Sequence, residues 1–348
     1  MRLTTIGEQN LSSHLFQYSD SSFCGIITQS APRLMAFLDL LTDCLDKFTV
    51  LLGPALILFA LVLIGFCTLV YFQYIVWSYD RGTGVGLTVV GIFILINVLY
   101  NYYKAVRVSP GLPPLAVDAA EYGHTTALSH RLRQYERLPS DDEDVSPSAT
   151  RLATCKKCSR IRPPRTHHCS ICKSCIYRYD HHCPWIYNCV GLRNVRFFYL
   201  FIFYAVLVVI FFISVSLPLF LEGIERKGDL TEGRPSIVMS FVLAAAVGVA
   251  LVAFLAFHTY LLLTNQTTME WATGGVRDDL RRSGKFRRNP YDLGRTRNWQ
   301  QIFGRHGWRW AFPYLDKSAE VEGGGTELPV FPTLGVHNPA RGLGSSRE

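Results

Sequence analysis

The chain has 348 residues, of which 49% are hydrophobic and only 18% charged, and its formal net charge is +8. Such a low charged fraction is unusual for a soluble protein of this length. The composition therefore argues against an ordinary soluble globular protein and favours one with membrane-spanning segments.

The N-terminal segment 1–47 begins with a polar stretch and lacks the apolar core of a signal peptide. Within 34–48, Asp39, Asp43 and Asp46 recur at helical spacing opposite a set of apolar residues. This pattern predicts an amphipathic helix, which either lies on the membrane surface or packs against the membrane helices.

Four later stretches contain no Asp, Glu, Lys or Arg, and each exceeds the roughly 20 residues that a helix needs to cross a bilayer. We assign membrane spans to 48–79, 83–103, 197–221 and 236–264. Buried helices of a large soluble core are the alternative, but these runs are too long for ordinary core helices.

Loop charge predicts the orientation of the spans. The segment 104–195 and the start of the C-terminal region are rich in Lys and Arg, whereas the loops 78–82 and 222–234 have no basic excess. By the positive-inside rule, both termini and the segment 104–195 face the cytosol. The glycosylation sequons at Asn10 and Asn265 then lie in the cytosol too.

The segment 104–153 reads as a cytosolic linker. It is largely polar and includes an acidic run at 141–144, with Ser140 and Ser146 beside it. Phosphorylation of these serines is one interpretation, and a solvated acidic linker is the simpler one.

The segment 154–195 contains seven of the ten cysteines and four histidines. Its CxxC pairs are typical of zinc sites, and thiols in the reducing cytosol favour metal ligation over disulfides. Two four-ligand sites of three Cys and one His each would use six cysteines. One cysteine is therefore surplus.

Cys183 is the strongest candidate for the surplus thiol, because it directly follows Asp180, His181 and His182. An imidazole can take the proton of a thiol, and a carboxylate can orient that imidazole. In an extended segment His181 and Cys183 would lie on one face and His182 on the other. Placing Asp180 beside His181 then requires a turn near residue 180.

The last two segments are a cytosolic region at 265–316 and a tail at 317–348. The tail is rich in Gly and lacks apolar periodicity, so we expect it to be disordered.

The run CKKCSRIRPPRTHHCSICKSCIYRYDHHCPWIYNCVGLRNVRFF, which starts at Cys155, resembles the cysteine-rich domain of the DHHC family of protein S-acyltransferases (palmitoyltransferases). The resemblance implies that Cys183 is acylated from acyl-CoA, with His181 and Asp180 as catalytic partners, and passes the acyl group to a substrate cysteine. It implies two structural Zn²⁺ sites, one of Cys155, Cys158, His168 and Cys175 and the other of Cys169, Cys172, His182 and Cys189. His167 is not among these ligands.

Three further motifs extend the resemblance. Ser109-Pro110-Gly111 stands where the family has Asp-Pro-Gly, so any role of that carboxylate is in doubt. Thr267-Thr268-Met269-Glu270 matches the family's Thr-Thr-x-Glu, in which the second Thr is expected to contact the catalytic Asp. Asn289-Pro290-Tyr291 and then Asn298 resemble the C-terminal aromatic motif, in which Asn298 is expected to anchor the tail.

The resemblance and the spans together predict an α-helical integral membrane protein with four transmembrane helices and a cytosolic zinc-bound domain between the second and third. We expect a ping-pong enzyme of an endomembrane (endoplasmic reticulum or Golgi) that contacts membrane lipid. It would move a long-chain acyl group, palmitoyl, from acyl-CoA to accessible cysteines of cytosolic or membrane-anchored proteins. Arg193, Arg196 and Arg277 either meet the CoA phosphates or hold topology and anionic lipid.

Parts of the sequence also suggest three other functions. A basic zinc domain with Arg160, Arg162 and Arg165 suits nucleic acid, but its place against a membrane argues for no such partner. A catalytically silent membrane zinc scaffold that binds partner proteins would use Asp180 and His181 only to support a metal ligand, and it needs no thiol at Cys183. A transporter is disfavoured because His258 is a poor ion path by itself.

Overall fold

The computed structural model describes residues 21–113, 154–163, 165–225, 234–274, 289, 291–304 and 307–312. Within these residues four helices are long and apolar enough to cross a membrane, at Cys44–Ser78, Arg81–Arg107, Val195–Glu222 and Pro235–Leu263. The prediction of four membrane helices is confirmed. Most of the predicted linker, the 317–348 tail, Asn10 and Arg277 lie outside the described residues.

The chain forms two compact units, Met1–Leu51 and Leu52–Glu348. Helix α1 (Ser21–Val70) includes the described part of the first unit and continues into the second. The segment 34–48 is therefore helical, as predicted, but it runs into the first span without a break. Residues 33–53 contain no proline, so nothing in the sequence interrupts the helix there.

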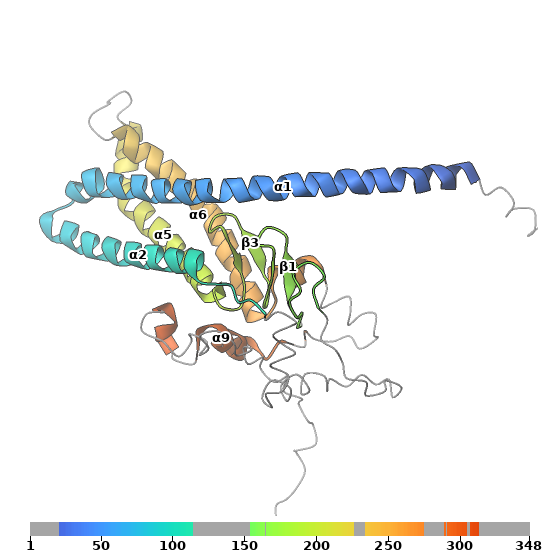
Figure 1. Ribbon diagram of the computed structural model, residues 1–348. Helices are drawn as coiled ribbons and strands as arrows, with labels where there is room; N and C mark the ends of the chain where they lie inside the picture. The colour runs from blue at the N-terminus through green and yellow to red at the C-terminus, as the bar shows by residue number, and fades with distance from the viewer. Residues whose placement is uncertain are drawn as a thin grey trace, which may run out of the picture. The chain divides into compact units, whose positions relative to one another are not determined.

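Three helices follow α1 through the membrane. After the short turns η1 (Tyr71–Ile75) and η2 (Val76–Ser78), α2 (Arg81–Arg107) begins where the Asp80 side chain accepts hydrogen bonds from the first backbone N–H groups. Helix α5 (Val195–Glu225) packs against both α2 and α6 (Arg234–Leu263), as Figure 1 shows.

Two short antiparallel hairpins fill the connection from α2 to α5. Strand β1 (His167–Cys169) pairs with β2 (Ser174–Ile176), and β3 (His181–Cys183) pairs with β4 (Asn188–Val190). Because each strand has three residues, the hairpins bury little apolar surface of their own. Their stability therefore has to come from contacts with other parts of the chain or from a bound group.

The second hairpin is fixed to the end of α2. The Asn188 side chain donates hydrogen bonds to the carbonyls of Ala105, Val106 and Val108 at 3.0–3.2 Å, which satisfies acceptors that a helix end leaves open. Gly191 lies so close to the Pro110 carbonyl that an added Cβ would approach it to 2.7 Å. The hairpin that carries Cys183 is thus held at the C-terminal end of α2.

The Pro-Gly turn after α2 is retained without the acidic residue. Ser109 Oγ accepts a hydrogen bond from the Gly111 N–H at 3.3 Å, and Gly111 adopts a φ of +99° that favours glycine. The Pro110 and Gly111 carbonyls accept hydrogen bonds from the backbone N–H groups of Arg193 and Tyr177. The serine hydroxyl therefore supplies an acceptor within the turn where the family has a carboxylate.

The C-terminal elements pack beside α5 and α6. They are α7 (Thr268–Ala272), α9 (Arg295–Phe303) and η3 (Gly307–Ala311). Aromatic side chains of α9 and η3, among them Phe303 and Trp310, contact Tyr199 and Phe203 of α5. The region after the fourth span is thereby joined to the membrane helices.

Candidate active site and metal centres

Two groups of Cys and His side chains are placed to bind metal ions. One contains Cys155, Cys158, His168 and Cys175, and the other contains Cys169, Cys172, His182 and Cys189. In each group the four ligand atoms lie within 4.8 Å of one another. These are the two sets that the family resemblance implies.

The distances between ligand atoms in the two groups fit a metal ion with tetrahedral coordination. Cys158 Sγ lies 3.6 Å from Cys175 Sγ, and His182 Nδ1 lies 3.4 Å from Cys172 Sγ. A tetrahedron with metal–ligand bonds of about 2.0–2.3 Å has edges of about 3.3–3.8 Å. The residues therefore fit a metal of zinc's size and preference.

In each His-His pair, one histidine belongs to a metal group and its neighbour does not. His168 and His182 belong to the metal groups, whereas His167 does not, and its ring centroid lies 6.1 Å from that of Tyr179. In the second pair, His181 lies beside Asp180, and its Nδ1 is 2.6 Å from Asp180 Oδ2. The alternation expected for an extended segment is observed in β3.

Asp180 is a buried carboxylate with several hydrogen bonds. It precedes β3 and follows a turn in which Arg178 has a φ of +45°, so the turn expected near residue 180 is present. Its Oδ1 accepts the Thr268 N–H at 2.8 Å and its Oδ2 accepts the Thr268 hydroxyl at 2.7 Å. Burial alone would raise the pKa of Asp180, but the bonds from His181 and Thr268 lower this pKa to about 2.

The His181 ring connects Asp180 to Cys183. Burial would lower the pKa of His181, but interactions with Asp180 and with the Cys183 thiol raise it to about 9. Phe198 of α5 lies edge-on to the ring, with centroids 5.3 Å apart. The carboxylate, imidazole and thiol form a row of the kind that activates a sulfur nucleophile.

Cys183 lines an apolar cavity of about 600 Å³ among the membrane helices. The cavity walls come from α1, α2, α5 and α6 and include Phe59, Tyr102, Phe198, Ile202, Leu251 and Phe254. Trp185, on the turn after Cys183, lines the same cavity, and its carbonyl accepts a hydrogen bond from the Tyr102 hydroxyl. The thiol thus faces a volume large enough for a small-molecule ligand and almost entirely apolar.

The Thr-Thr-x-Glu motif forms the start of the short helix α7. Thr267 is the N-cap, and its hydroxyl accepts the Glu270 N–H while the Glu270 carboxylate accepts the Thr267 N–H. This reciprocal cap orients the next residue, Thr268, toward Asp180. The second Thr contacts the aspartate, as the resemblance implies.

Asn298 of α9 is buried and bonded on both sides. Its Nδ2 donates to the Leu263 carbonyl at 2.8 Å, and its Oδ1 accepts the Leu293 N–H at 2.9 Å. It therefore connects the C-terminal segment to the end of the fourth span.

Comparison with known proteins decides the family. A model described as DHHC palmitoyltransferase matches residues 148–274. The Arabidopsis thaliana protein named Probable protein S-acyltransferase 12 is 35% identical over 250 residues, which cover 71% of this chain and 79% of the relative. The chain belongs to the DHHC family. Among its relatives are Palmitoyltransferase ZDHHC15A of Danio rerio, 29% identical over 69% of this chain and 72% of the relative, and Palmitoyltransferase ZDHHC2 of Mus musculus, 34% identical over 51% and 46%.

This membership gives the DHHC chain its enzyme class, protein S-acyltransferase. Of the three arginines proposed for CoA, Arg196 is buried, Arg193 is half-buried and Arg277 lies outside the described residues. The structure does not single out any of them as a phosphate ligand.

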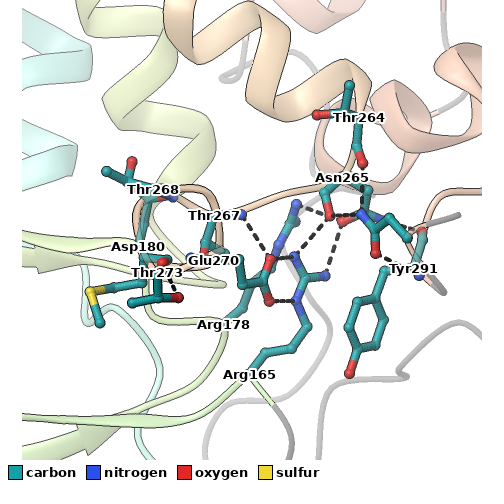
Figure 2. Close-up of polar contacts among 12 residues, drawn as sticks. Arg165, Arg178, Asp180, Thr264, Asn265, Thr267, Thr268, Glu270, Thr273 and Tyr291 are labelled. Carbon is teal, nitrogen blue, oxygen red and sulfur yellow. Dashed lines mark hydrogen bonds and ion pairs between the residues drawn. The ribbon is translucent and has the colours of Figure 1, made fainter. Parts of the chain in front are cut away.

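Sequence reasoning about this DHHC enzyme missed the contacts that three residues make near Asp180. Arg165, Arg178 and Asn265 lie together beside Glu270 of α7 (Figure 2). The sequence suggests Arg165 as a contact for nucleic-acid phosphates, but its side chain is only 7% exposed. The Asn265 sequon is also buried, so the folded protein cannot present it for glycosylation. The signal in the sequence was their position, with Arg165 and Arg178 inside the cysteine-rich run and Asn265 two residues before Thr267.

Proposed function

We propose that the chain transfers a long-chain acyl group, palmitoyl, from acyl-CoA to cysteine thiols of substrate proteins through an acyl-Cys183 intermediate. The observation that carries this proposal is the position of Cys183, which lies beside the Asp180–His181 pair and also lines an apolar cavity. A protein that only binds metal could use the Asp180–His181 pair to support a ligand, but it needs no thiol beside that pair facing an apolar cavity.

The cavity supports a long-chain donor. Burying an acyl chain favours binding by about 0.8 kcal/mol for each CH₂ group. The lining is apolar along its length, whereas the polar pair of Asp180 and His181 lies near Cys183. A chain inside the cavity would leave its thioester at the sulfur and the CoA head group outside the membrane.

The first step forms the acyl-enzyme. The Cys183 sulfur attacks the thioester carbon, its proton passes to His181, and the bond to the CoA sulfur breaks. His181 then returns the proton to the CoA thiolate, which leaves as the free thiol. Asp180 accepts the hydrogen bond from His181 Nδ1 and stabilises the ring while it carries the extra proton.

The second step reverses these roles. A substrate cysteine gives its proton to His181 and attacks the acyl-Cys183 carbonyl, and the Cys183 sulfur leaves and recovers the proton. Donor and acceptor thus use one site in turn, which gives ping-pong kinetics.

Two Zn²⁺ ions, held by the two Cys and His groups, would supply structure rather than chemistry. Five of the eight ligands, His168, Cys169, Cys175, His182 and Cys189, lie in three-residue strands, so bound metal would contribute directly to folding of the domain.

Loop charge supports a cytosolic active site with both termini on the same side of the membrane, which we propose is an endomembrane. Modification of engineered single cysteines in sealed vesicles tests the orientation. Labelling of the 222–234 loop from the cytosolic side would contradict it.

Acyl-CoA labelling tests the function. Purified protein incubated with an alkynyl palmitoyl-CoA should take up a hydroxylamine-sensitive label, and Cys183→Ser should abolish it. Cys44→Ser is the matched control, because Cys44 is exposed and lies outside the cluster. If the protein were a silent scaffold, the wild-type chain would bind two metal ions but would not be labelled. Label on the Cys183→Ser variant would exclude this cysteine as the nucleophile.

A further inference from the structure

A buried ion pair joins the segment just before β1 to α7. The Arg165 guanidinium meets the Glu270 carboxylate with both prongs, Nε to Oε1 at 2.6 Å and Nη2 to Oε2 at 2.8 Å (Figure 2). The side chains are 7% and 10% exposed. Removing one partner of such a pair leaves the other charge buried without compensation, so the contact restrains both elements.

Arg165 makes further contacts through both terminal nitrogens of its guanidinium. Nη1 donates to Asn265 Oδ1 and Nη2 donates to the Asn265 carbonyl, both at 3.0 Å. The Tyr291 ring lies under the guanidinium at 4.4 Å from its centroid. Arg178 donates to the same Asn265 oxygen at 3.0 Å. Arg165 is therefore fixed by the end of the fourth span and by the C-terminal segment.

The ion pair bears on the catalytic aspartate through one turn of helix. Helix α7 has five residues, too few to hold a helical conformation without outside contacts. The Glu270 carboxylate that binds Arg165 also accepts the Thr267 N–H at 2.9 Å. Thr268, the next residue, gives its N–H and hydroxyl to Asp180.

A second connection reaches Asp180 from the other side. The Arg165 carbonyl accepts the N–H of Tyr179, the residue before Asp180, at 3.0 Å. Arg165 holds this position with a φ of +62°, a region that costs a non-glycine residue energy unless its surroundings fix it. The backbone and the side chain of one residue thus both lead to Asp180.

We propose that Arg165 is a positioning residue for the Asp180–His181 pair, acting through Glu270 and the first turn of α7. The segment that leads into the first hairpin then contributes to catalysis at the second hairpin. This inference rests on the proposed role of Cys183. It predicts slower formation of the acyl-enzyme, with no change in KM for acyl-CoA or in metal content.

The test measures single-turnover acylation of the purified full-length chain in detergent against the concentration of palmitoyl-CoA. Arg165→Gln should lower the maximal rate by about 10- to 100-fold, as expected when catalytic groups are misplaced. Arg165→Lys should not restore it, because an ammonium cannot bind the carboxylate with two prongs. Arg162→Gln is the matched control, since Arg162 is exposed three residues away. Wild-type rates in Arg165→Gln would overturn the proposal.

A second background separates positioning from general damage. In a chain carrying Asp180→Ala there is no carboxylate to position, so adding Arg165→Gln should change the residual rate by less than about twofold. A further tenfold loss there would show that Arg165 acts elsewhere and would overturn the proposal.

A double variant guards against misfolding. Arg165→Met with Glu270→Met removes both buried charges, and such apolar replacements are often tolerated. It should retain two metal ions per chain and still acylate slowly, and a normal rate would again overturn the proposal. Failure of the proposed acyl-Cys183 function would be recognised by a different result, namely label that persists in Cys183→Ser.

Discussion

The two hairpins share the same strand pairing and turn geometry, but we propose different chemical roles for them. Each begins with His-His-Cys, and each pairs its middle histidine with a cysteine on the opposite strand, His168 with Cys175 and His182 with Cys189. Both turns contain a residue at positive φ, Lys173 and Tyr187, at the same distance from the strand. In both, the middle histidine and its cross-strand cysteine belong to one metal group.

The hairpins differ at the third residue. Cys169 opens a CxxC turn whose second cysteine, Cys172, joins it in a metal group. Cys183 opens the equivalent turn, but Ile186 stands in place of the second cysteine and is fully buried against apolar side chains. A thiol at a position that binds metal in one hairpin therefore remains free in the other and faces the cavity.

They differ again before the first histidine. Thr166 precedes His167, whereas Asp180 precedes His181 and binds its Nδ1. One missing cysteine and one added carboxylate thus distinguish the proposed reactive centre from the other hairpin.

Serine substitutions at the two equivalent cysteines give the largest contrast. Cys169→Ser should lose one metal ion per chain and destabilise the domain, because structural zinc contributes on the order of 10 kcal/mol to such folds. Cys183→Ser should keep two metal ions and lose acylation. Elemental analysis beside the labelling assay measures both, and loss of metal from Cys183→Ser would end the distinction.

The residues before the two histidines give the next contrast. Asp180→Ala should slow acyl-enzyme formation by about 10²- to 10⁴-fold, the usual range for acid–base catalysis. Thr166→Val, at the equivalent buried position, should stay within about twofold of wild type. Single-turnover rates decide, and equal losses in the two variants would contradict a specific role for the carboxylate.

Thr268→Val should have an intermediate effect. It removes the hydroxyl bond to Asp180, worth about 1.5–3 kcal/mol for a charged acceptor, and leaves the backbone bond in place. We expect a rate about tenfold or more below wild type. The control is Thr264→Val, because the Thr264 hydroxyl bonds only within its own helix end. Equal rates for Thr268→Val and the control would remove Thr268 from the site.

Replacing His167 should have the smallest effect. His167→Phe keeps an aromatic ring against Tyr179 and should change neither metal content nor acylation beyond about twofold. His181→Phe, at the matching position, should leave no measurable acylation. If His167→Phe lost metal, the ligand sets would need revision.

Some of this site was readable in the sequence. The spacing of cysteines and histidines predicted two four-ligand sites and one surplus thiol, and the order Asp180-His181-His182-Cys183 indicated which thiol it was. The replacement of a CxxC cysteine by Ile186 was a further signal in the same stretch. The continuity of α1 was not foreseen, because the aspartates at 39–46 suggested a separate surface helix.

The sequence by itself determined the four spans and the surplus cysteine, because hydrophobic length and ligand spacing are properties of neighbouring residues. Only the tertiary structure decided what surrounds Cys183. Thr268 reaches Asp180 across 88 positions and Arg165 reaches Glu270 across 105, and the cavity needs four helices at once. Such contacts depend on how distant segments pack, and no local pattern records that packing.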